Sequence, residues 1–217
     1  MMTTNLSKIQ YPKMQADELM SEERVFRVVF VSTDGTRKPE LMTDGGIRKL
    51  TAGIKVVLGQ TIRSNDCRVE IRDNRGAIFR LGQKAEFSIE QTENGISPVY
   101  YGEIYKGRIS YDPGMTCGTS KYRTSCWVGC PISVYMRPTK RNSDEFFCFS
   151  TDCPIWEYDE AGRKFTIVHL DEGQKCTLDY TPNVPMRERY SVKNVETISD
   201  DEYDYIVEHF INPRFWR

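Results

Sequence analysis

The sequence has few of the features that reveal a function directly. Its 217 residues include only two histidines, and 30 basic side chains almost balance 31 acidic ones, which leaves a net charge of −1. The chain therefore lacks the strong overall field that gathers nucleic-acid phosphates or anionic membranes. No apolar run approaches the roughly 18 residues of a membrane-spanning helix, and the start of the chain has no signal-peptide pattern. We therefore expect a cytoplasmic protein that does not enter a membrane.

Common catalytic and phosphate-binding motifs are also missing. The sequence contains no GxGxxG, GxxxxGK[ST], HExxH or GxSxG pattern. Its two histidines, His169 and His209, lie 40 positions apart, and we interpret both as structural or solvent-facing residues. We predict that the protein is not an enzyme and has no catalytic, cofactor-binding or metal-binding residues.

Seven cysteines are too few for a disulfide scaffold in a chain of this length, and their number is odd. Five of them lie close together in the sequence and raise the question of a zinc site: Cys117, Cys126, Cys130, Cys148 and Cys153. Their spacings match no recognised zinc motif. We therefore favour reduced thiols buried in strands, and keep a zinc protein or a cysteine-dependent enzyme as an alternative.

The pattern of apolar residues predicts a mainly β, α+β protein, an antiparallel β-sandwich that forms a single domain over residues 1–217. Residues 1–24 are expected to form an N-terminal arm with a peripheral helix. Its apolar positions Met14, Leu19 and Met20 form a stripe that is too thin for a core helix. Residues 25–198 are expected to form the sandwich, and residues 199–217 a C-terminal helix and tail.

The first part of the sandwich should combine strands with one internal helix. Val25 to Val31 reads as a buried strand, and the turn residues Asp34 and Gly35 favour a tight hairpin with residues 37–42 as its antiparallel partner. Apolar residues then recur at helical spacing, which predicts a helix over about residues 45–58.

Further along, alternating apolar and polar residues predict hairpins and strands. We expect residues 67–71 to pair with 77–81, and residues 87–89 to pair with 99–104 across the turn pair Asn94 and Gly95. Later strands are predicted over residues 127–135, 146–149, 155–158 and 165–170. Ser199 and Glu202 have capping-box spacing and begin a helix that continues to residue 211.

Twelve tyrosines form a large stock of groups that are neutral at pH 7 and lose a proton near pH 10. At alkaline pH they would add negative charge and oppose a tight assembly. Adjacent or nearly adjacent pairs make Tyr100, Tyr101, Tyr203 and Tyr205 our candidates for such an alkaline switch.

Two segments carry a family resemblance. VFRVVFVSTDGTRKPELMTDGGIRKLTAGIKVVL (Val25 to Leu58) and YIVEHFINPRF (Tyr205 to Phe215) resemble segments of cypovirus polyhedrins, the occlusion-body proteins of insect reoviruses. The resemblance implies trimers that pack into crystals around virus particles in the cytoplasm of the infected cell. Such crystals protect the virus and dissolve in the alkaline insect midgut.

The resemblance also implies partners. The N-terminal helix of these proteins links neighbouring units, which would make Met14, Leu19 and Met20 assembly contacts. The expected partners are further copies of the chain and the embedded virus particles. Some family members hold nucleotides, but the sequence offers no phosphate-binding motif, and no nucleotide-binding residue is assigned.

Another viral structural protein is the main alternative. A matrix protein or a jelly-roll capsid subunit would bind nucleic acid or membrane and often carries a basic arm. The N-terminal residues MMTTNLSKIQ do not form such an arm.

Overall fold

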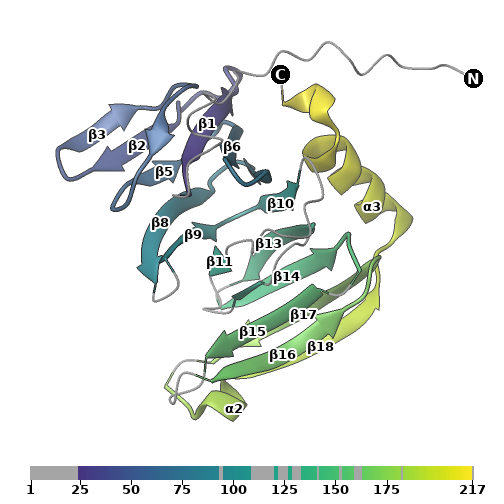
Figure 1. The fold of residues 1–217 in the computed structure, drawn as a ribbon. Coiled ribbons are helices and arrows are strands. Elements are labelled where there is room, and N and C mark those ends of the chain that lie inside the picture. Colours follow the sequence, from purple (N-terminus) through teal and green to yellow (C-terminus); the bar gives the residue numbers. More distant parts are fainter. Residues whose placement is uncertain are drawn as a thin grey trace, which may run out of the picture.

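The computed structural model describes residues 24–92, 95–108, 120–121, 127–128, 133–140, 142–151, 153–158, 163–181 and 183–216. It confirms the predicted mainly β fold, with two large sheets and few helices (Figure 1). The predicted N-terminal arm, with Met14, Leu19 and Met20, lies outside the described residues.

Each sheet contains nine strands among the described residues, and we name them by their order across the sheet. The first sheet is β18 (Tyr190–Thr197), β17 (Gln174–Tyr180), β14 (Ser143–Cys148), β13 (Val134–Lys140), β10 (Ile104–Arg108), β7 (Ala77–Leu81), β6 (Val69–Asp73), β1 (Phe26–Val31) and β4 (Lys55–Val56). The second sheet is β16 (Lys164–Leu170), β15 (Cys153–Tyr158), β12 (Trp127–Val128), β11 (Ser120–Lys121), β9 (Gly95–Tyr101), β8 (Glu86–Thr92), β5 (Thr61–Arg63), β2 (Glu40–Thr43) and β3 (Gly46–Lys49). Adjacent strands are antiparallel, but β9 and β11 pair in parallel.

The main core lies between the two sheets. The first sheet contributes Phe79 and Phe146, and the second contributes Phe87 and Ile155; all four side chains are fully buried in one cluster. Period-two alternation along each strand sends every second side chain into this layer. The predicted hairpins β6–β7 and β8–β9 are confirmed by their antiparallel registers.

A second apolar layer covers the outer face of the first sheet. The closing helix α3 (Asp200–Ile206) continues into a π-helical turn (Val207–Ile211) and a 3-10 turn (Pro213–Phe215), as the sequence predicts. Ile206 and Phe210 pack against Tyr105, Tyr135 and Phe147, whose strand neighbours point inward to the main core. Figure 1 shows the helix running beside β10, β13 and β14. No helix of the described part of the chain is long and apolar enough to cross a bilayer.

The predicted helix over residues 45–58 is wrong. The chain forms β3, a turn and β4 there, and Gly46 and Gly53 adopt φ angles of 108° and 91°, which a right-handed helix excludes. Its apolar residues also do not share one buried face, because Leu50 is buried whereas Ile47 is 63% exposed. Pairing of β2 with both β3 and β5 overrides the helical spacing of the apolar residues.

The expected pairing of residues 25–31 with 37–42 is also wrong. β1 pairs with β4 and β6, whereas β2 belongs to the other sheet. The turn after β1 therefore carries the chain from one sheet to the other, and Leu41 enters the core from the opposite side. The predicted strand over residues 127–135 is likewise divided, because β12 and β13 lie in different sheets.

Candidate functional site

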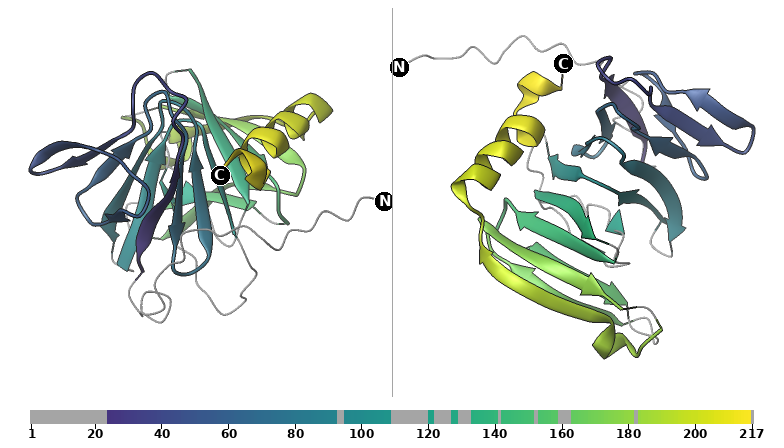
Figure 2. Two further views of the ribbon diagram at one scale, coloured as in Figure 1. Left: turned by 90° about the horizontal axis from the view of Figure 1, so that it is seen from above. Right: turned by 180° about the vertical axis from the view of Figure 1, so that it is seen from behind.

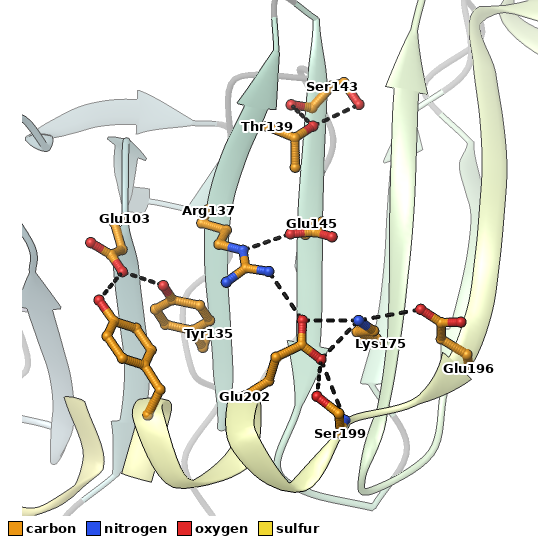
Figure 3. Close-up of polar contacts among 11 residues, drawn as sticks. Glu103, Tyr135, Arg137, Thr139, Ser143, Glu145, Lys175, Glu196, Ser199 and Glu202 are labelled. Atoms are coloured by element: carbon orange, nitrogen blue, oxygen red, sulfur yellow. Dashed lines mark hydrogen bonds and ion pairs between the residues drawn. The ribbon is translucent and has the colours of Figure 1, made fainter. Parts of the chain in front are cut away.

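The closing helix is held on the sheet by a cluster of titratable groups, which we call the helix latch. Its central members are Glu103, Tyr135 and Tyr205. The hydroxyls of both tyrosines donate to the same oxygen, Oε1 of Glu103, with 3.1 Å between Tyr205 Oη and this oxygen (Figure 3). Glu103 follows Gly102, whose φ of 98° and close approach to Ala85 leave no room for a Cβ. This glycine lets the tight β9–β10 turn present Glu103 to the helix.

Both phenols of the helix latch hold their protons more strongly than free tyrosine does. Burial first, and then the charge of Glu103 and the hydrogen bond to it, raise the pKa of Tyr205 to about 12. The same causes raise the pKa of the more deeply buried Tyr135 further. Burial also raises the pKa of Tyr105, which packs in the same apolar layer. These tyrosines therefore stay neutral well above pH 10, the ordinary tyrosine pKa.

Ion pairs anchor the N-terminal end of the helix beside the helix latch. Arg137 lies 2.6 Å from Glu145 on the neighbouring strand and 3.1 Å from Glu202 on the helix. Lys175 joins the same Glu202 at 2.8 Å and also Glu196 at 3.2 Å (Figure 3). Glu202 thus connects the helix with strands β13 and β17 at one point.

The start of the helix is capped by Ser199. Its backbone N–H and its hydroxyl donate to Glu202 Oε2 at 3.3 and 2.9 Å, and the predicted capping box is confirmed. Burial raises the pKa of Glu202, but the hydrogen bonds from Lys175 and Ser199 outweigh it and lower the pKa overall. Burial lowers the pKa of Lys175, and Glu202 and Glu196 reverse that effect, so this pKa is raised. Both partners therefore stay charged over a wide pH range.

The C-terminal end of the helix is held by a buried charged network. Arg80 donates through Nη1 to the backbone oxygens of Phe210 and Ile211, the second at 2.7 Å. Its Nε also donates to buried Glu70 at 2.7 Å, and Arg72 donates to the other oxygen of this carboxylate. A cation at these carbonyls stabilises the negative end of the helix dipole. The helix is therefore fixed at both ends and at its middle.

Of the four predicted switch tyrosines, only Tyr205 belongs to the helix latch. Tyr203, on the same helix, is 47% exposed, and its ring packs against Phe149 at 5.6 Å. Tyr101 is partly buried on β9. Tyr100 is fully buried between the sheets against Phe79, where no other molecule can reach it while the sandwich stays closed.

Sequence reasoning missed Glu103 and Tyr135, which complete the helix latch. Tyr135 lies in a predicted strand, and its alternation with buried Val134 and Met136 could have placed it on the opposite sheet face. Its contact with a carboxylate 32 positions away has no signal in a single sequence.

The described cysteines are buried, free thiols, as the favoured interpretation predicts: Cys67, Cys148, Cys153 and Cys176. Cys117, Cys126 and Cys130 lie outside the described residues. No three histidine, cysteine or acidic residues of the described part converge as metal ligands. His169 is exposed on β16, and the His209 ring stacks between Tyr205 at 4.5 Å and Phe215 at 5.8 Å. His209 thus takes part in the packing of the closing helix.

Comparison with known proteins identifies no relative: no family model, no curated protein and no solved structure matches this chain.

Proposed function

We propose that this chain is a structural protein that assembles with copies of itself into intracellular crystals of the occlusion-body type. Such crystals would embed virus particles in the cytoplasm of an infected cell and dissolve at alkaline pH. A trimer is the proposed building unit. The observation that carries the proposal is the helix latch, in which Tyr205 and Tyr135 share one carboxylate oxygen of Glu103.

The helix latch has the chemistry of an alkaline release device. Each phenol donates a hydrogen bond to Glu103 while it is neutral, and each becomes a second negative charge beside Glu103 once it loses its proton. Attraction then becomes like-charge repulsion at the contact between helix and sheet. Because the pKa of Tyr205 is raised to about 12, this change belongs to strongly alkaline conditions and leaves the neutral protein undisturbed.

The family resemblance supports the proposal unevenly. The closing segment Tyr205 to Phe215 has the helix and the proline-containing turn that the resemblance implies. The segment Val25 to Leu58 keeps its first strand, but two short strands stand where a helix was implied. The proposal therefore depends more on the latch chemistry than on this segment.

The test is expression of the full, untagged chain in insect cells, followed by a pH titration of any intracellular crystals from neutral to strongly alkaline. We expect refractile crystals that persist at neutral pH and dissolve between about pH 10 and about pH 12. Tyr205→Phe should raise the dissolution threshold, because it removes a group that becomes charged. Tyr203→Phe is the matched control on the same helix and should leave the threshold unchanged. A chain that remains a soluble monomer at every pH would overturn the proposal.

A further inference from the structure

A basic hollow of about 270 Å³ opens next to β5 and β8 of the second sheet. Its lining residues are Arg37, Arg63, Asn65, Lys84, Ala85 and Glu86. Arg63 is paired with Glu86 at 2.7 Å, so one cation of the hollow is already balanced. Arg37 and Lys84 are exposed, and neither forms a salt bridge within the described ranges. The hollow therefore offers two uncompensated positive charges to a partner.

The backbone holds the basic hollow in a fixed shape. Asn65 and Lys84 adopt left-handed φ angles of 50° and 58°, and the Lys84 N–H donates to the Asn65 carbonyl at 2.6 Å. The Asn65 side chain also donates to the carbonyl of Lys38 at 2.7 Å. Because these bonds join three separate loops, the cations need no large rearrangement to receive a partner.

The region around the hollow is basic, and the closing helix is acidic. Residues 37–63 contain six basic side chains and two acidic ones, whereas residues 196–208 contain six acidic side chains and no basic one. On α3 and its continuation, Asp200, Asp204 and Glu208 follow one another at four-residue spacing, and Asp201 lies beside them; all four are exposed. We call these four residues the acidic ridge. Figures 1 and 2 show the β2–β3 hairpin and α3 on opposite sides of the molecule.

We propose that the acidic ridge of one copy docks in the basic hollow of a second copy. The chain carries both charged surfaces, so a second copy supplies the complementary charge that the hollow needs. Because the two surfaces lie on opposite sides, one copy can use both at once, and the contact repeats head to tail. The inference rests on the proposed self-assembly and assigns a contact to it.

A charge-swap experiment tests this contact. Arg37→Glu with Lys84→Glu gives a copy in which hollow and ridge are both acidic, and Asp204→Lys with Glu208→Lys gives a copy in which both are basic. Each variant alone should associate at least roughly tenfold more weakly than the wild type in sedimentation velocity at low salt. An equal mixture should recover association, because each hollow then meets a ridge of opposite charge. Added salt should weaken both the wild-type and the mixed assemblies.

The control is Arg187→Glu with Arg214→Glu, two exposed cations away from the hollow that give the same change in net charge as the hollow variant. It should associate like the wild type, and circular dichroism should show an unchanged fold for every variant. Wild-type assembly that the hollow variant retains in full would overturn this contact but leave the proposed function standing. A wild type that does not associate would overturn both. If the hollow variant assembles normally but loses affinity for a single-stranded RNA oligomer in fluorescence anisotropy, the hollow is a nucleic-acid site instead.

Discussion

At the scale of single residues, Glu103 joins the closing helix to the sheet. Its Oε1 atom accepts from both Tyr135 and Tyr205, and a hydrogen bond to a charged acceptor is about twice as strong as a neutral one. The two donors differ in their surroundings. Tyr135 is fully buried, whereas Tyr205 is 40% exposed, so water can replace only the second of these donors.

This difference predicts unequal losses of stability when each hydroxyl is removed. Tyr135→Phe should lower the free energy of unfolding at neutral pH by about 1.5–3 kcal/mol, the range for a hydrogen bond to a charged group. Tyr205→Phe should cost less, roughly 0.5–1.5 kcal/mol, because its site is partly solvated. Urea unfolding measures both values, and equal losses for the two variants would contradict the assigned geometry.

The raised pKa of Tyr205 can be tested through Glu103. Glu103→Gln keeps an acceptor oxygen but removes the negative charge, so the pKa of Tyr205 should fall from about 12 toward the ordinary value near 10. NMR of protein labelled with ¹³C at the tyrosine ring follows this single titration. Tyr203 serves as the internal reference, because it makes no contact with Glu103 among the printed hydrogen bonds of the helix latch. A Tyr205 pKa that does not respond to the substitution would remove Glu103 as a cause.

At the scale of elements, the closing helix depends on its first turn. Ser199 donates to Glu202, and Glu202 in turn reaches Arg137 and Lys175 on the sheet. Capping and docking therefore meet in one carboxylate, and a change in the cap should also disturb the ion pairs.

Ser199→Ala should accordingly lower the free energy of unfolding by about 1 kcal/mol, the usual cost of losing an N-cap. Ser191→Ala, in an exposed position of the edge strand β18, is the matched control and should change stability by no more than about 0.5 kcal/mol. Thermal unfolding followed by circular dichroism gives both values. A loss as small in Ser199→Ala as in the control would show that the cap contributes nothing to the helix.

The elements differ in how well the sequence predicts them. The closing helix and the hairpins β6–β7 and β8–β9 are confirmed, because their caps, turns and alternation act over short distances. The helix expected over residues 45–58 failed, because Gly46 and Gly53 take left-handed angles and β2 pairs on both sides. Local spacing could not report those distant pairings.

The candidate site follows the same division. The sequence places Tyr205 on a capped helix, and it offers Tyr205 as a switch residue on local grounds. Glu103 and Tyr135 lie 102 and 32 positions from the residues they contact, and only the sheet order brings them together. The fold class was therefore more predictable than the chemistry under the helix.

At the scale of the whole molecule, a net charge of −1 conceals a separation of charge. The basic surface near β2, β3 and β5 and the acidic closing helix lie on opposite sides (Figure 2). Small net charge limits self-repulsion, and separated charges of opposite sign orient copies relative to one another. Both properties suit a protein that packs against itself, and strong alkali removes them by deprotonating lysines and tyrosines together.

Burial also predicts how the whole chain responds to alkaline pH. The pKa values of Tyr105, Tyr135, Tyr205, Cys153 and Cys176 are all raised in the folded protein, those of Tyr205 and Cys176 to about 12. Near pH 11 the folded chain therefore keeps protons that the unfolded chain has lost, so the free energy of unfolding falls as pH rises above the ordinary pKa values. Unfolding near pH 11 should release about five protons from these groups, and almost none from them at pH 7. Proton release on mixing with guanidinium chloride at constant pH measures this number. A release near zero at pH 11 would mean that these side chains already titrate in the folded protein.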